Sequence, residues 1–195
     1  MALEITQAGG KGEAVGHPVF YFSFDSPDAY LAAERVLQMI AGPCEWVPIR
    51  APQDPWVFRC AEEQTIAEQQ IELVAAERNL LPLRWPPAFD PELALRAGTF
   101  AKSIGRSVAF TLAAFRQAYA GGADLADPEV LLIAAAGCEM HPRAVLTALD
   151  RDGITRTLDA ATADAVGRGV TRIPTVWFPD GSLLEGDAAL DQVAA

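Results

Sequence analysis

The sequence predicts an α/β fold built from a strand–helix–strand unit near the N-terminus and a strand–strand–helix unit near the C-terminus. Three observations predict it: an aromatic, β-branched run that leads into a helical pattern, a long helix-rich middle, and an Asp-Gly turn between two apolar runs. With 195 residues, 51% of them hydrophobic, the chain is long enough for one domain with a large insertion.

The first unit begins with residues 18–24 (PVFYFSF), which lack helical spacing and are typical of a buried strand. The following segment, DAYLAAERVLQMIAG, carries apolar residues at helical spacing and stops at Gly42 and Pro43. Residues 45–49 (EWVPI) are short and β-prone. A unit of this length predicts two parallel strands joined by a right-handed crossover.

The middle of the chain predicts a helical insertion over residues 61–150. Residues 61–78 have the acidic first turn of a helix, whereas the four prolines within residues 80–91 exclude a regular helix there. Helical spacing then continues over residues 91–120, 127–136, 141–151 and 155–168.

The second unit consists of two short strands, residues 175–178 and 182–185, around the turn Pro179-Asp180-Gly181. A short helix over residues 188–194 ends the chain. We therefore expect a flexible, Gly-rich start at residues 1–16, a sheet-containing domain formed by residues 17–60 and 151–195, and the helical insertion between them.

The charge of the chain excludes several partners. The formal net charge is -11, and the only lysines are Lys11 and Lys102, so neither nucleic acid nor an anionic membrane surface is an expected partner. The start of the chain lacks a secretory apolar core, and no stretch has the ~20 apolar residues of a membrane span. These features predict a cytoplasmic protein.

The cysteines, Cys44, Cys60 and Cys138, are odd in number and form no Cys-x-x-Cys motif. This pattern disfavours a disulfide framework and a dithiol redox centre. With only two histidines, His17 and His141, the sequence predicts no metal site.

Two local patterns, residues 24–31 (FDSPDAYL) and 169–175 (GVTRIPT), accompany the order βαβ then ββα. Together they resemble the DsbA-like thioredoxin superfamily, and within it the branch of 2-hydroxychromene-2-carboxylate isomerase and kappa-class glutathione transferase. Residues 83–87 (LRWPP) and 127–137 also match. In that branch Ser-Pro-x-x replaces the redox Cys-Pro-x-Cys, as it does at residues 26–29 here. The resemblance implies a thioredoxin-like fold with an all-helical insertion domain.

The predicted helix after the first strand begins at Ser26, where free N–H groups favour an anion. The resemblance implies that the Ser26 hydroxyl holds the thiolate of bound glutathione ready for attack. The alternative is that Asp25 or Ser26 is only a helix cap. The resemblance further implies that Pro174 follows a cis peptide bond and that the main chain of Ile173 binds the glutathione.

By the same resemblance, a cavity for a hydrophobic or aromatic substrate is lined by Asp25, Tyr30, Arg84 and Trp85. Tyr30 and Trp85 also fit ordinary core positions, and Arg84 fits a solvated charge. Trp56, like Tyr30, fits either the border of the cavity or the core. The helical spacing of Phe115 and Tyr119 predicts packing residues.

The chain departs from this branch at two places that bind glutathione in the relatives. Their Gly-Gln-Asp-Arg-Leu motif is replaced by Gly-Asp-Ala-Ala-Leu at residues 186–190, so Ala188 and Ala189 stand where the relatives carry aspartate and arginine. Asp187, one residue earlier, is the candidate to replace that aspartate. The loop over residues 49–58 is short and lacks lysine and asparagine, which leaves Arg50 as the substitute for the positive charge.

The resemblance therefore predicts a glutathione-dependent isomerase or transferase for a small hydrophobic or aromatic molecule, with a homodimer as its expected assembly. Two alternatives stay open. A thiol-disulfide oxidoreductase lacks the cysteine it needs at residues 26–29, and a catalytically degenerate binding module is favoured by Ala188, Ala189 and the short loop.

Overall fold

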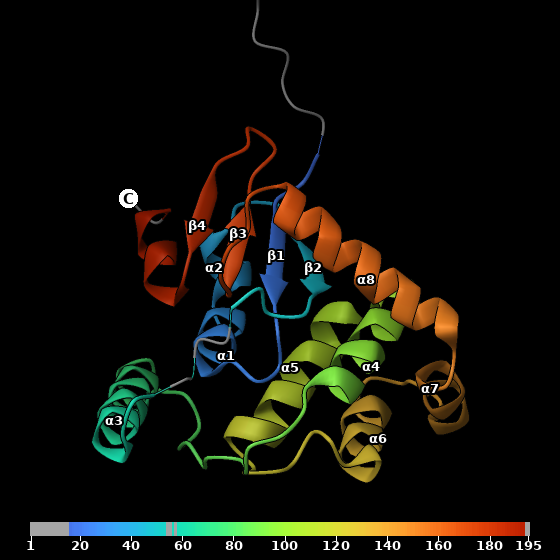
Figure 1. Ribbon diagram of the computed structural model, residues 1–195, viewed down its shortest axis with the longest axis horizontal. Helices are drawn as coiled ribbons and strands as arrows, with labels where there is room; N and C mark the ends of the chain where they lie inside the picture. The colour runs from blue at the N-terminus through green and yellow to red at the C-terminus, as the bar shows by residue number, and fades with distance from the viewer. Residues whose placement is uncertain (1–15, 54–55, 57, 194–195) are drawn as a thin grey trace, which may run out of the picture.

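The computed structural model describes residues 16–53, 56 and 58–193 (Figure 1). Its four-stranded sheet has the order β2-β1-β3-β4. Strand β1 (Val19–Phe22) pairs in parallel with β2 (Glu45–Pro48), while β3 (Thr175–Trp177) runs antiparallel to both β1 and β4 (Leu183–Glu185). The predicted α/β sheet of a strand–helix–strand and a strand–strand–helix unit is confirmed.

Both faces of β1 are buried, which explains why its sequence, VFYF, does not alternate with polar residues. Phe20 and Phe22 point to one face, where both rings contact Trp46 of β2. Val19 and Tyr21 point to the other face and pack with Ala165. The sheet is therefore the middle layer of the molecule.

The helices that cover the sheet follow the predicted order (Figure 1). On the Phe20 face lie α1 (Pro27–Ala33), α2 (Val36–Met39), α4 (Glu92–Ser103) and α5 (Ser107–Tyr119), and on the Val19 face lies α8 (Asp152–Gly167). The remaining helical elements are α3 (Ala61–Glu77), α6 (Pro128–Ala136), α7 (Pro142–Leu149) and a C-terminal 3₁₀ helix (Asp187–Gln192).

Several helices differ from their predicted extents. The helix after β1 is interrupted between α1 and α2, and residues 91–120 form two helices because the chain turns at Gly105, whose φ of +73° suits glycine. Helix α8 begins at Asp152 rather than at residue 155, and the last helix is 3₁₀. The expected flexible start at residues 1–16 lies outside the described residues except for Gly16, and so does Ala194 of the predicted last helix.

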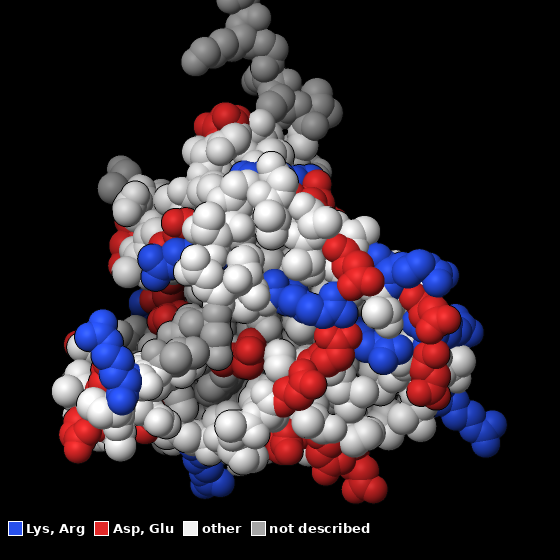
Figure 2. Space-filling model, viewed as in Figure 1, with Lys and Arg blue, Asp and Glu red and all other residues white. Residues whose placement is uncertain are grey.

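None of the helices in the described part of the chain combines the length and apolar character that a membrane span requires. On the face shown in Figure 2, acidic and basic side chains are interspersed over α8 and the helices below it.

Helix α4 approaches the sheet closely at Gly98. A β-carbon at this position would lie 3.1 Å from Cε2 of Phe24 and 3.4 Å from Cγ of Pro48. Phe24 is fully buried, with its ring 5.2 Å from that of Phe115, so it has little room to retreat. Glycine at position 98 therefore sets the distance between α4 and the end of β2.

We predict that Gly98→Val lowers the free energy of unfolding by about 1–3 kcal/mol, because the added methyl groups overpack the contact with Phe24. Urea unfolding at equilibrium measures this loss. Gly167→Val is the matched control, since a β-carbon at this helical glycine would meet no heavy atom within 4 Å apart from its chain neighbours and the nearby backbone of its own helix. Equal losses in the two variants would contradict the interpretation.

Candidate functional site

The turn from β1 into α1 forms one wall of the candidate site. Ser26 is the N-cap of α1: its Oγ accepts a hydrogen bond from the Ala29 N–H at 3.1 Å, and Pro27 occupies the first helical turn. Ser26 is 0% exposed. Before it, the Ser23 hydroxyl donates to the carboxylate of Asp25. The backbone and side chains of this turn are therefore held by local hydrogen bonds.

The segment before β3 lies at the same end of the sheet. Tyr21 pairs with Thr175, so the strand register continues from the end of β1 toward Pro174 and Ile173. The Ile173–Pro174 peptide bond is cis, and the Pro174 carbonyl accepts from the Gly186 N–H at 2.7 Å. Ile173 is 3% exposed, and its own N–H and C=O have no hydrogen-bond partner among the described residues.

A cavity of about 350 Å³ opens beside this turn. Its floor and walls come from residues on both sides of Ser26, from α3, from the proline-rich loop and from the end of α5. The aromatic lining residues are Trp56, Phe58, Trp85, Phe89 and Tyr119, and the polar ones are Asp25, Gln64 and Glu68. A volume of this size fits a small molecule.

Hydrogen bonds and ring contacts hold the aromatic wall in place. The Trp85 indole N–H donates to Glu72 of α3 at 2.8 Å, and its ring lies 5.6 Å from that of Trp56. The Tyr119 hydroxyl donates to the Phe24 carbonyl at 3.2 Å. Tyr30 stacks behind Tyr119 at 5.4 Å and is 1% exposed.

Of the four residues predicted for the substrate cavity, the structure brings Asp25 and Trp85 together in its lining. Tyr30 lies behind the wall as a core residue. Arg84 is exposed and does not line the cavity, although its main-chain N–H donates to the Tyr119 carbonyl at 2.8 Å.

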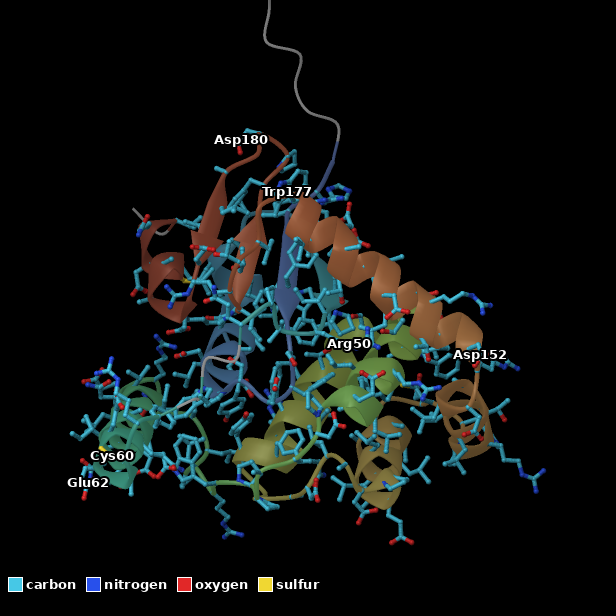
Figure 3. All side chains as sticks on the ribbon, in the orientation of Figure 1. Arg50, Cys60, Glu62, Asp152, Trp177 and Asp180 are labelled. Carbon is cyan, nitrogen blue, oxygen red and sulfur yellow. The ribbon has the colours of Figure 1, made fainter. Side chains whose placement is uncertain are left out.

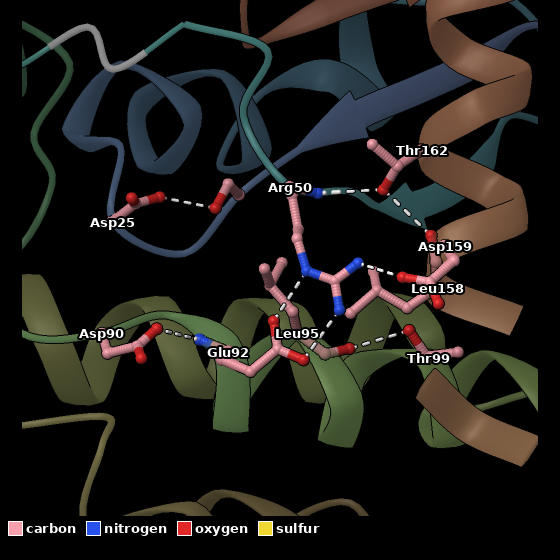
Figure 4. A network of polar contacts seen from close by, with 10 residues as sticks. Asp25, Arg50, Asp90, Glu92, Leu95, Thr99, Leu158, Asp159 and Thr162 are labelled. Atoms are coloured by element: carbon pink, nitrogen blue, oxygen red, sulfur yellow. Dashed lines mark hydrogen bonds and ion pairs between the residues drawn. The ribbon is translucent and has the colours of Figure 1, made fainter. Parts of the chain in front are cut away.

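Arg50 does not line the cavity, and its side chain is directed toward α4 and α8 (Figures 3 and 4). Its guanidinium donates twice to Glu92 at 2.8 Å and also binds Asp159. The guanidinium charge of Arg50 is thus already neutralised by two carboxylates. These two ion pairs link the loop after β2 to α4 through Glu92 and to α8 through Asp159.

Asp187, the other residue predicted to bind glutathione, is 7% exposed and lies between two arginines. Arg35 donates to it from the start of α2 at 3.0 Å, and Arg78 donates to both of its carboxylate oxygens from the end of α3, the shorter contact being 2.6 Å. Asp187 therefore ties the C-terminal 3₁₀ helix to α3 and to the break between α1 and α2.

Carboxylates influence the ionisation of nearby groups. The pKa of Asp28, in the first turn of α1, is raised from 3.8 by burial and by the charge of Asp187, against the opposing effects of Arg172 and Arg78. The pKa of the Tyr119 phenol is raised well above its usual value, mainly by burial and further by Asp25 and Asp28. Burial, with a smaller contribution from nearby carboxylates, therefore disfavours the charged forms of both groups.

The cysteines lie apart from this lining. Burial raises the pKa of Cys44 to about 11 and also raises that of Cys138, so both stay protonated thiols at neutral pH. Cys60 is exposed at the outer end of α3 (Figure 3). Across the described ranges, no group of three or more His, Cys, Asp or Glu side chains has the arrangement of a metal site.

The sequence did not point to several of the lining residues. The helical spacing of Tyr119 predicts a packing role, and Phe58, Phe89, Gln64 and Glu68 were not singled out. The last two are four residues apart and so share a face of α3, with the Gln64 amide donating to Glu68 at 2.7 Å. Only the placement of α3 decides that this face meets the cavity.

Comparison with known proteins identifies the architecture. The family model described as DSBA-like thioredoxin domain matches residues 19–195. The structure of 2-hydroxychromene-2-carboxylate isomerase is 17% identical, with a TM-score of 0.79 over 92% of this chain and 93% of that one. A probable DsbA oxidoreductase from Streptomyces coelicolor is 18% identical, with a TM-score of 0.70 over 91% and 89%. At these identities the likeness shows the fold, which is thioredoxin-like. No protein among those with curated functions matches the sequence.

We predict that Asp28→Asn raises the melting temperature near pH 7. Because the folded state holds the Asp28 proton more tightly than the unfolded state, stability falls as pH rises from 3.8 through the higher folded-state pKa. An amide avoids this loss, so the gain should disappear below that window. Thermal unfolding across the acidic and neutral range measures it. Asp152→Asn, an equal charge change in the exposed first turn of α8, should give no such gain.

Proposed function

Since this chain belongs to the family of DSBA-like thioredoxin domains, we propose that it is an enzyme that binds a small aromatic molecule in the cavity beside Ser26. It would use glutathione as a thiol cofactor to isomerise or conjugate that molecule. One observation carries the proposal: Asp25 and Pro27, the two neighbours of Ser26, both line an aromatic cavity of small-molecule size.

In this proposal, Ser26 stabilises the cofactor thiolate. Its Oγ accepts from the Ala29 N–H, so the hydroxyl hydrogen itself is still available to donate to sulfur. Such a bond favours the ionised thiol, which is the nucleophile. Because Ser26 has no exposed surface, cofactor binding must shift the turn over residues 25–27 before sulfur reaches the hydroxyl.

The main chain of Ile173 supports a peptide-like cofactor. Its N–H and C=O can pair with the backbone of glutathione as an added strand segment. Arg172, exposed and adjacent, supplies a cation for a cofactor carboxylate. Arg50 and Asp187 would contribute only by exchanging their present ion pairs, which makes both weaker candidates than the sequence alone suggested.

A catalytically degenerate binding module is the second candidate. The full burial of Ser26 and the ion pairs around Arg50 and Asp187 favour it, because each of these groups already has a structural role. A thiol-disulfide oxidoreductase is less well supported, since residues 26–29 hold no cysteine and the buried thiols have raised pKa values.

We predict that Ser26→Ala lowers glutathione-dependent turnover about 10²-fold, which is typical of removing one hydrogen bond to a developing anion. Conjugation of glutathione to 1-chloro-2,4-dinitrobenzene, followed by absorbance, provides the assay. The variant should also lose about 1 kcal/mol of stability, because it removes a helix cap.

Asp127→Ala is the matched control for that loss of stability. Asp127 caps α6, where its carboxylate accepts from the Glu129 N–H at 2.8 Å, and it does not line the cavity. Unchanged turnover in Ser26→Ala would refute the assignment of Ser26. A wild-type protein that gives no turnover but whose melting temperature rises with glutathione would favour the binding module.

A further inference from the structure

The charges around the aromatic cavity are all of one sign among its described lining residues. Asp25 reaches it from the turn after β1 and Glu68 from α3, and none of the described lining residues is Lys, Arg or His. Arg59 and Arg84, the nearest basic residues along the chain, are exposed and outside the lining. A ligand in this cavity therefore meets carboxylates from two different elements.

Neutral hydrogen-bond donors contact both of these carboxylates. The donor that binds Glu68 is the amide of Gln64, and a donor that binds Asp25 is the hydroxyl of Ser23. Both of these donors are neutral groups, so these two hydrogen bonds add no positive charge to the cavity wall. Glu72 adds a third acid immediately behind the wall, where it accepts from the Trp85 indole.

The aromatic side chains favour the same kind of ligand. Trp56 and Trp85 lie 5.6 Å apart with their planes inclined by 51°, and Tyr119 meets Trp85 edge to face at 6.3 Å. The face of an aromatic ring carries partial negative charge and attracts cations, most strongly for indole. Rings and carboxylates thus create a negative potential in one confined volume.

We propose that the ligand of this cavity is a flat, aromatic molecule that carries an ammonium or similar cationic group, and not an aromatic carboxylate. This inference rests on the proposed function, because it names the substrate class for the same cavity. It also distinguishes the chain from its structural neighbour, whose name specifies a chromene carboxylate as the substrate. A carboxylate placed here would face two like charges without a described basic partner in the lining.

Calorimetric titration of the full chain with three naphthalene probes tests the proposal: 2-naphthylmethylammonium, neutral 2-naphthalenemethanol and 2-naphthoate. The ammonium probe should bind at least about tenfold more tightly than the carboxylate, with the alcohol between them. Added salt should reduce that ratio. No thiol is present, so a failure of the proposed glutathione chemistry would leave this result unchanged.

Glu68→Gln should lower the ammonium-to-carboxylate ratio about threefold or more, because it removes one lining charge without changing the side-chain shape. Glu77→Gln is the matched control: the same helix loses the same charge at a residue outside the lining, nine positions away. Equal reductions in the two variants would show only the general attraction of a chain with net charge -11, and would overturn the proposal. Naphthoate binding as tight as that of the ammonium probe, or no binding by any probe, would overturn it as well.

Discussion

The structure depends on the burial of strand β1 on both of its faces. The four-residue strand VFYF is hydrophobic on both faces, so it is stable only if helices cover it from two sides. Helix α8 covers Val19 and Tyr21, while α1, α4 and α5 enclose Phe20 and Phe22. The close approach at Gly98 is one consequence, because α4 must come near the sheet to seal the core around Phe24.

The candidate site lies where this tightly packed core ends. Beyond β1 the chain turns through Asp25 and Ser26, and α3 lies beside α1 at the edge of the molecule (Figure 1). Two long-range polar contacts hold α3 there: Arg78 binds Asp187 of the C-terminal 3₁₀ helix, and Glu72 accepts from Trp85. The cavity exists because prolines 86 and 87 and the aromatic side chains near them bridge from α3 to α5 without forming a helix of their own.

Two residues with apparent roles in ligand binding have structural partners instead. Arg50 joins the loop after β2 to α4 and α8, and Asp187 joins the C-terminus to α2 and α3. Removing one partner of such a pair leaves a partly buried charge uncompensated, which is costly. These ion pairs give Arg50 and Asp187 structural roles at the positions where a glutathione contact was expected. The aromatic cavity and the main chain of Ile173 are therefore better candidates for ligand binding.

The sequence by itself determined the order of strands and helices, a helix cap at Asp25 or Ser26 and the hairpin at Asp180-Gly181, because strand runs, caps and tight turns depend on neighbouring residues. Through the resemblance of local motifs it also predicted Asp25 and Trp85 as cavity residues, and both line the cavity described here. Only the tertiary structure decided that Gln64, Glu68 and Tyr119 complete the lining, that Tyr30 lies behind it, and that Arg50 and Asp187 form ion pairs. These outcomes depend on which face a helix presents and on partners 40 to more than 100 residues away, such as Glu92 for Arg50 and Asp187 for Arg78, and no local pattern encodes either.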